Sequence, residues 1–252
     1  MRALIGHTGF VGSNLCRTGR YDAFFNSRNS HEMAGHHFSE VVCAGVSAVK
    51  WKANKDPEAD WRQISSLIDV LTRIRADHFV LISTVDVYSK PLQVTEDDAA
   101  TETGASYGAH RARLERFVRE HFLSHLIIRL PALYGRGLKK NAIFDLCHGN
   151  MVEAIDPRAQ FQWYDVERLE EDMARIAPAR LRLLNLTAEP VAMSEIADRY
   201  FPGQLRSREL GTPPAHYDMR TLHASLLGGN GGYHYTRAQV LDGIGAFLER
   251  SR

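Results

Sequence analysis

Short apolar runs alternate with amphipathic stretches along most of the chain. The apolar runs have the length and content of buried strands, and they lie at Arg2 to Ile5, Ala23 to Phe25, Val41 to Val46, Phe79 to Ser83, Leu126 to Leu130 and Leu181 to Leu186. Apolar residues recur with helical spacing at Val11 to Arg17, residues 58 to 75, Tyr107 to Glu120 and Thr236 to Arg250. Alternating strands and helices are typical of βαβ units. The pattern predicts an α/β fold with a doubly wound, mostly parallel sheet of the Rossmann type.

The alternation loosens after Pro131, where glycines and prolines separate shorter elements. We therefore expect two parts: residues 1–133 plus about 161–186 as a dinucleotide-binding domain, and about 134–160 plus 187–252 as a small discontinuous substrate lobe. Between Asn26 and Val41 only about fifteen residues are available, which is too few for a long helix and another strand. One element of the sheet is expected to be reduced or missing there.

The composition narrows the classes of protein that this chain can represent. It has 44% hydrophobic and 24% charged residues, as in an ordinary globular protein. A net charge of +1 gives no broad positive field, so neither nucleic acid nor a membrane is an expected partner. Three widely spaced cysteines do not make a disulfide framework. The chain starts without an apolar signal stretch and contains no membrane-length apolar run, and we expect a cytoplasmic protein.

A glycine motif follows the first predicted strand directly and opens a helix. It reads Gly6-His7-Thr8-Gly9-Phe10-Val11-Gly12, with the spacing G-x-x-G-x-x-G. Glycines at this place allow a tight turn and let phosphate groups approach the backbone N–H groups of the helix N-terminus. The motif therefore predicts a dinucleotide site, with contacts from Gly6, Thr8, Gly9, Phe10, Val11 and Gly12.

The end of the second strand indicates which dinucleotide is bound. An acidic residue about twenty positions after the glycine motif is typical of NAD sites, because it accepts hydrogen bonds from the ribose. This chain has Asn26, Ser27 and Arg28 there, with no carboxylate. A guanidinium and a hydroxyl suit the 2′-phosphate of NADP. NADP is therefore favoured over NAD, although Arg28 could also be an ordinary solvated charge.

Two further segments carry candidate chemistry. Thr84 ends the strand that begins near Phe79, at the edge of the sheet where open α/β folds bind ligands. Tyr107 and Arg111 stand four residues apart on one face of a predicted helix. A cation beside a phenol stabilises the phenolate and moves its pKa from about 10 towards working pH. Tyr107 is therefore a candidate proton donor.

Taken together, these motifs resemble the extended branch of the short-chain dehydrogenase/reductase family, which includes nucleotide-sugar epimerases, dehydratases and keto-sugar reductases. The glycine motif matches that of the family, Thr84 with Val87-Tyr88 matches its S/T-x-x-V-Y, and Tyr107-Gly108 matches its Y-G-x-x-K. The segment Arg129-Leu130-Pro131-Ala132-Leu133-Tyr134-Gly135 is similar to its R-x-P-x-x-Y-G. The order and spacing of these matches carry the likeness over most of the chain.

The resemblance implies a role for each matched residue. Thr84 would hydrogen-bond the reacting oxygen, Tyr107 would donate or remove its proton, and Arg111 would hold the nicotinamide ribose and bias the phenol. Further cofactor contacts are implied for Cys43, Ala44, Gly45 and Pro131. Substrate contacts are implied for Asp86, Tyr88 and Asn141. The family usually has lysine where this chain has Arg111, and the two side chains are not interchangeable.

We expect an NADP-dependent reductase of a carbonyl, with the keto group of a nucleotide-linked sugar as substrate. An epimerase or dehydratase that retains NAD is one alternative. A cofactor-binding regulatory protein without turnover is another, because position 111 departs from the family. The family also suggests a homodimer, packed through the helices that contain residues 58–75 and 107–120.

Two other features are assigned no site. His31, His36 and His37 lie close together but lack a carboxylate or cysteine at ligand spacing, so a solvated loop is favoured over a metal site. The aromatic run at residues 161–166 is expected to be core, since aromatic residues on a strand usually pack inside.

Overall fold

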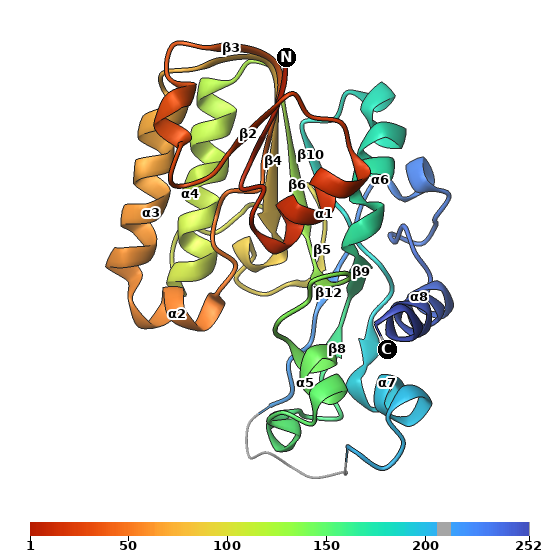
Figure 1. Ribbon diagram of the computed structural model, residues 1–252. Helices are drawn as coiled ribbons and strands as arrows, with labels where there is room; N and C mark the ends of the chain where they lie inside the picture. Colours follow the sequence, from red (N-terminus) through yellow and green to blue (C-terminus); the bar gives the residue numbers. More distant parts are fainter. Residues whose placement is uncertain (206–212, 252) are drawn as a thin grey trace. The chain divides into compact units, whose positions relative to one another are not determined.

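The computed structural model describes residues 1–205 and 213–251, which divide into two compact units (Figure 1). Unit 1 contains Met1–Lys90, Glu96–Leu130 and Arg168–Asn185. Unit 2 contains Pro91–Thr95, Pro131–Glu167 and Leu186–Arg252. Unit 2 is thus assembled from three separate segments of the chain.

Unit 1 is built on a six-stranded sheet in which all neighbouring strands are parallel. The strands are β1 (Arg2–Ile5), β2 (Ala23–Phe25), β3 (His37–Cys43), β4 (Arg75–Thr84), β6 (His125–Leu130) and β10 (Leu183–Asn185). Their order is β10-β6-β4-β3-β1-β2. The chain moves from β1 to β2 on one side and then to β3 on the other, so the order reverses between β1 and β3. The predicted doubly wound fold is confirmed, and ligands of such sheets bind at this reversal, beyond the carboxyl ends of the strands.

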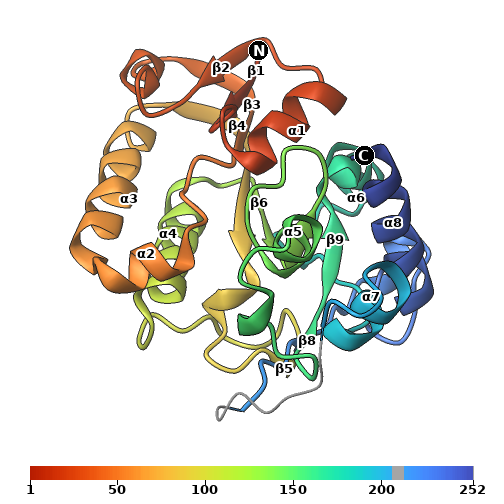
Figure 2. The same ribbon diagram turned by 60° about the horizontal axis from the view of Figure 1, so that its bottom comes forward.

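Helices cover both faces of this sheet (Figures 1 and 2). They are α1 (Phe10–Thr18), α2 (Lys50–Lys55), α3 (Pro57–Leu71), α4 (Ser106–His121) and α6 (Leu169–Ile176). In both views α3 and α4 lie together on one face, and α1 and α6 lie on the other. Each of the two helices α3 and α4 packs one apolar stripe against the core of the sheet. The stripe of α3 includes Ile64 and Leu71, and that of α4 includes Leu114 and Val118.

Two predicted boundaries are corrected by backbone pairing. The helix expected over residues 58–75 ends at Leu71, because the following turn is tied to the start of β3 through the bonds from Gly35 N–H to Arg73 and from Arg75 N–H to His36. The strand expected over residues 41–46 instead spans His37–Cys43. Its first residues pair with the start of β4, a long-range contact that the apolar pattern does not indicate.

The connection between β2 and β3 is short, as its length predicts. It holds only one 3-10 turn, Ser30–Met33, in place of a helix and a further strand. β2 therefore lies at the edge of the sheet, next to β1. The reduced element is confirmed.

Unit 2 consists of small two-stranded sheets and three helices among its described residues. The strands are β5 (Leu92–Val94), β7 (Ala132–Tyr134), β8 (Gln160–Phe161), β9 (Trp163–Asp165), β11 (Val191–Ala192) and β12 (Asp218–Met219), and the helices are α5 (Ala142–His148), α7 (Met193–Tyr200) and α8 (Arg237–Arg250). β7 pairs with β9, β8 with β11 and β5 with β12. Trp163 and Tyr164 are buried, so the aromatic run is core, as expected.

These pairings explain where the two units differ from the expected domains. Residues 161–167 were expected in the dinucleotide-binding domain, but β8 and β9 pair with strands of unit 2. Residues 91–95 belong to unit 2 for the same reason, through β5 and β12. Within the described residues, none of the helices is long and apolar enough to cross a membrane.

A buried ion pair connects α4 to β6 in unit 1. Arg129 donates to both carboxylate oxygens of Glu115, at 3.0 and 2.6 Å, and both residues are almost fully buried. Ser83 donates to the same carboxylate at 2.6 Å. Glu115 also has a longer contact with the partly exposed Arg119 at 3.3 Å. Since removal of Arg129 leaves the buried carboxylate with only this weaker cation, the pair is a strong constraint on how α4 packs against the sheet.

We predict that Arg129→Met lowers the free energy of unfolding by about 3 to 5 kcal/mol, because the buried Glu115 charge loses its two bonds from Arg129. The matched control is Arg116→Met on α4, the helix that carries Glu115. The ion pair of Arg116 with Glu102 is largely exposed, and the loss of such a pair costs about 0.5 kcal/mol. Urea denaturation of both variants tests this, and equal losses would contradict it.

Candidate functional site

The glycine loop after β1 needs glycine at two positions for packing. Gly6 has a φ of +86°, and a Cβ atom there would lie 2.4 Å from the carbonyl oxygen of Ala44. A Cβ atom at Gly12 would lie 2.1 Å from the carbonyl oxygen of Gly6. Gly9 closes the turn with an N–H bond to Gly6 at 2.9 Å. A larger residue at either packing position would push the loop away from α1 and from the end of β3.

This loop fits a dinucleotide phosphate. Gly9 is the N-cap of α1 and provides no side-chain cap, and the first turn of the helix has no acidic residue. The backbone N–H groups of that turn are therefore suited to an anion, which the helix dipole also favours. Thr8 and Gly9 are exposed on the loop, whereas Phe10 and Val11 are half-buried and begin the helix.

The turn after β2 holds its backbone through two asparagine side chains. Asn29 accepts from the Asn26 N–H at 2.8 Å, and Asn26 accepts from the Arg28 N–H at 2.8 Å. Ser27 and Arg28 are exposed. Among the ion pairs of residues 1–205 and 213–251, none involves Arg28. Its guanidinium is thus available to an anion beside a turn of fixed shape.

His7 also contacts this turn, and no sequence motif predicts this contact. Its Nδ1 lies 3.1 Å from the carbonyl oxygen of Phe25, and its Nε2 lies 3.5 Å from the Asn26 amide nitrogen. It therefore connects the glycine loop to the end of β2. The x positions of the glycine motif accept many residues, so the motif alone gives no signal for this contact.

The end of β3 and the residues that follow it contribute backbone rather than reactive groups. Cys43 is fully buried, and burial raises the pKa of its thiol to about 11. It therefore remains a thiol at neutral pH. Ala44 donates its N–H to Ile5 at 2.9 Å, which holds the ends of β1 and β3 together beside Gly6 and Gly45.

Thr84 and Tyr107 are brought together by a close contact between elements. Thr84 ends β4 and Tyr107 lies in the first turn of α4, and the Thr84 hydroxyl is one of the groups that lower the pKa of the Tyr107 phenol. Gly108 makes this approach possible, because a Cβ atom there would lie 1.9 Å from the carbonyl oxygen of Asp86. Asn54 of α2 accepts the Tyr107 N–H at 3.0 Å and so satisfies one of the first amides of the helix.

Burial is the largest influence on the pKa of the Tyr107 phenol and raises it above its ordinary value. The charge of Arg111, the hydrogen bond with Thr84 and the charge of Lys50 act in the opposite direction, while the charge of Asp86 adds to the increase. The expected net shift towards neutral pH is therefore wrong, because the expectation considered Arg111 without the burial of the phenol. Tyr107 is a phenol, not a phenolate, at physiological pH.

Two ion pairs lie around this tyrosine, and neither is indicated by a sequence motif. Arg111 is paired with Asp60 of α3 at 2.7 Å, and both are buried. Lys50 of α2 is paired with Asp86 at 2.6 Å. Asp60 and Lys50 come from helices outside the recognised motifs, so only the fold brings them to Tyr107.

The residues expected to contact substrate have different surroundings. Asp86 is half-buried, and its carboxylate is engaged by Lys50. Tyr88 is 4% exposed, and its hydroxyl accepts from Arg129 at 2.6 Å and donates to Asn185 at 3.1 Å. This burial and bonding leave Tyr88 little surface for a ligand.

The last two expected site residues belong to unit 2. Asn141 caps α5, where its side chain accepts from Phe144 N–H at 3.1 Å and donates to the Leu133 carbonyl at 2.8 Å. Pro131 immediately precedes β7. Both remain candidates for binding.

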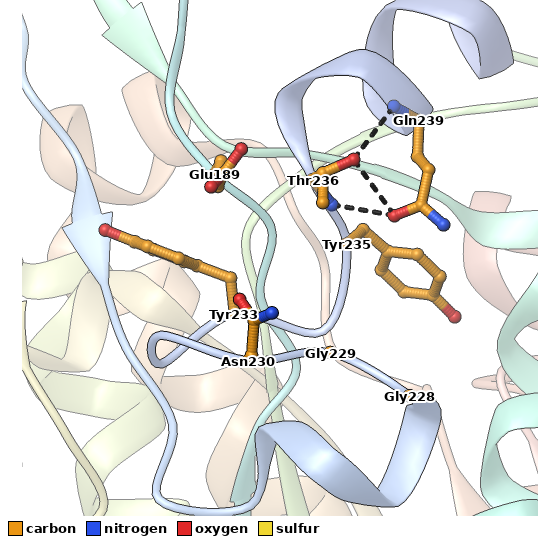
Figure 3. A pocket seen from close by; sticks show the side chains of 8 residues that line it. All are labelled: Glu189, Gly228, Gly229, Asn230, Tyr233, Tyr235, Thr236 and Gln239. Atoms are coloured by element: carbon orange, nitrogen blue, oxygen red, sulfur yellow. Dashed lines mark hydrogen bonds between the residues drawn. The ribbon is translucent and has the colours of Figure 1, made fainter.

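A cavity of about 330 Å³ lies in unit 2, around the start of α8 (Figure 3). Its lining consists of Glu189, Gly228, Gly229, Asn230, Tyr233, Tyr235, Thr236 and Gln239. Thr236 and Gln239 form a capping box at the start of the helix, and Glu189 accepts the Arg237 N–H at 2.7 Å. The cavity contains none of the residues expected in the site.

We predict that Gly108→Ala lowers the turnover rate at least tenfold and the free energy of unfolding by about 1 to 3 kcal/mol, because α4 must move away from Asp86. Gly35→Ala is the control: it has the left-handed φ of +80° but nothing within 4 Å, so it should strain the turn and leave turnover unchanged. Steady-state rates and thermal unfolding test this. Full turnover in Gly108→Ala would refute the role given to the contact.

Comparison with solved structures supports the fold. An NAD-dependent NDP-hexosamine 5,6-dehydratase involved in tunicamycin biosynthesis has a TM-score of 0.76 at 18% identity, with 100% of this chain and 98% of that chain covered. The dTDP-4-dehydrorhamnose reductase of Bacillus anthracis, in complex with NADP, has a TM-score of 0.75 at 15% identity, with 100% and 99% covered. MoeE5 in complex with UDP-glucose and NAD has a TM-score of 0.73 at 18% identity, with 100% and 98% covered.

Sequence comparison with curated proteins gives no match. A model of the NAD dependent epimerase/dehydratase family matches residues 25–153, just over half of the chain. That range includes β3, β4 and α4, and with them Thr84, Tyr107 and Arg111. The chain therefore belongs to the NAD dependent epimerase/dehydratase family and is an NAD(P)-dependent oxidoreductase of the extended short-chain dehydrogenase/reductase type.

Proposed function

We propose that the protein is an NADP-dependent reductase that acts on a carbonyl group, the keto group of a nucleotide-linked sugar. The observation that carries this proposal is the close approach of α4 to the carboxyl end of β4 at Gly108, which brings Tyr107 near the Thr84 hydroxyl, with Tyr107 kept as a phenol by burial. A phenol beside a hydroxyl is suited to donate a proton to an oxygen on which negative charge develops.

The residues of this chain divide the work of such a reduction. NADPH, when bound, supplies the hydride that is added to the carbonyl carbon. The Thr84 hydroxyl donates a hydrogen bond to the carbonyl oxygen and orients it. Tyr107 transfers its proton to that oxygen as charge develops there, so the carbonyl becomes an alcohol. The Lys50–Asp86 pair lies beside this proton donor and helps to set its environment.

The choice of NADP rests on the end of β2. Arg28 and Ser27 are exposed beside the turn, and the segment has no carboxylate to repel a 2′-phosphate. The B. anthracis reductase of similar fold was solved with NADP, which supports the choice of both cofactor and reaction. The nucleotide-sugar substrate is supported by the dTDP-sugar reductase and by MoeE5 with UDP-glucose.

An epimerase or dehydratase that retains NAD is the competing proposal, because family members with similar folds include a dehydratase and an epimerase. The two proposed activities differ in whether the enzyme releases its cofactor. An enzyme that returns its hydride to the substrate retains the cofactor, whereas a reductase releases oxidised cofactor after each turnover. Identification of nucleotide carried through purification, with NADPH consumption on keto-sugar substrates, separates the two.

We predict that Tyr107→Phe lowers the rate of carbonyl reduction by roughly a hundredfold to ten-thousandfold, because it removes the proton and retains the ring. The affinity for NADPH should change little. The control is Tyr21→Phe, which removes a hydrogen bond to Glu170. Tyr21 takes no part in the proposed chemistry, so this variant should reduce the carbonyl at the parent rate. Single-turnover oxidation of NADPH measures the effect. Reduction at the parent rate by Tyr107→Phe would refute the proposed proton donor.

We predict that Arg28→Ala reduces the preference for NADPH over NADH by about tenfold to a hundredfold, the value of one charge-assisted hydrogen bond of roughly 1.5 to 3 kcal/mol. The matched control is Arg73→Ala. Arg73 is exposed and precedes β4, so it lies at the amino ends of the strands, whereas Arg28 follows the carboxyl end of β2. Titration with each cofactor gives the ratio of dissociation constants. An unchanged ratio in Arg28→Ala would show that another group reads the 2′-phosphate.

A further inference from the structure

Arg111 is held in a cage of hydrogen bonds. Its Nη1 donates to Asp60 Oδ2 at 2.7 Å and to the Tyr107 carbonyl at 3.0 Å. Its Nη2 donates to Asp60 Oδ1 at 2.9 Å and to the Ser47 carbonyl at 2.6 Å. A guanidinium has five N–H groups, four of them on the two terminal nitrogens. These four are all engaged, so the terminal nitrogens of Arg111 cannot hold a ribose without breaking a buried bond.

Asp60 accepts two of the four hydrogen bonds that hold Arg111. Its carboxylate accepts from both terminal nitrogens of Arg111, Nη1 and Nη2, and also contacts His110 Nδ1 at 2.7 Å. Burial opposes its ionisation, but the hydrogen bonds from Arg111 and His110 outweigh burial and keep the pKa of Asp60 below its usual range. Asp60 is therefore an anion, and its charge lies directly against that of Arg111.

The guanidinium also lies against the ring of Tyr107. Its carbon is 3.9 Å from the ring centroid, within the distance of a cation–π contact. The ionisable groups that face Tyr107 or its neighbour are Arg111 and His110 from α4, Asp60 from α3, Lys50 from α2 and Asp86 from the turn after β4. Both cations in this set are paired with a carboxylate. Each cation near the phenol therefore has a carboxylate beside it that opposes its effect on the phenol.

We propose that Asp60 is a positioning residue for the proton donor: it holds Arg111 against the Tyr107 ring, offsets part of its charge and so acts together with burial to keep Tyr107 in the protonated form. Reduction of a carbonyl needs a phenol that gives a proton, whereas oxidation of an alcohol needs a base that takes one. The Asp60–Arg111 pair thus favours reduction over the oxidation with which an epimerase would begin. This direction of reaction rests on the proposed function, but the electrostatic effect does not.

The test is the titration of Tyr107 itself, followed by NMR of ring-labelled tyrosine in the protein without cofactor or substrate. Tyr107→Phe identifies the signal among the nine tyrosines. We expect Asp60→Asn to lower the pH at which Tyr107 ionises by about one unit, because the Arg111 charge is no longer offset. The matched control, Asp69→Asn, changes an exposed carboxylate of the same helix and should leave the titration unchanged.

A second pair of variants keeps the test decisive if Asp60→Asn alone does not fold. Arg111→Gln leaves the Asp60 charge uncompensated and should raise the pH at which Tyr107 ionises. The double variant Asp60→Asn with Arg111→Gln has neither charge and should return it close to the parent value. A double variant that titrates like Arg111→Gln alone would overturn the proposal, as would parental titration in a folded Asp60→Asn.

The experiment also separates this inference from the proposed function. The titration needs no substrate, so it can succeed even when Tyr107→Phe retains full reductase activity. In that case the Asp60 effect on the phenol stands and the proposed reaction fails. Conversely, an unmoved titration together with a slow Tyr107→Phe enzyme overturns the role of Asp60 and leaves the reductase intact.

Discussion

The site depends on how closely the first turn of α4 approaches the end of β4. Gly108 has no side chain, and the space that a Cβ atom would need is taken by the backbone of Asp86. This contact places Tyr107 beside Thr84 and, one helical turn later, directs Arg111 towards α3. A single steric condition therefore positions both the proton donor and the group that controls its charge. The remaining contacts of the site hold this arrangement in place.

Two buried arginine–carboxylate pairs fix α4 on its two sides. Glu115 is paired with Arg129 of β6, which ties the helix to the sheet, and Arg111 is paired with Asp60, which ties it to α3. Buried pairs of this kind add little net stability compared with apolar packing, but they penalise any other position of the helix. The same construction thus has two effects. One pair sets the distance from α4 to the strands, and the other sets the charge that Tyr107 experiences.

Much of the fold could be predicted from the sequence, because its strands are apolar runs and its glycine loop has fixed spacing. Thr84 and Tyr107 could be identified for a similar reason, since both lie within short motifs next to a strand end or helix start. Asp60 and Lys50 could not, because their contacts with α4 and Asp86 join elements that no local pattern relates. The pKa of Tyr107 was mispredicted because a motif shows the neighbouring cation but not burial.

The short connection after β2 changes how the cofactor end of the site is built. Without a further strand beyond it, β2 is an edge, and the turn at residues 26–29 is held by its own asparagines rather than by a neighbouring strand. Such a turn fixes the Arg28 backbone while its side chain remains exposed. Ordering that side chain on an anion costs rotamer entropy of about 1.5 to 2 kcal/mol. The charge-assisted bond assigned to Arg28, roughly 1.5 to 3 kcal/mol, is the net value that remains after this cost.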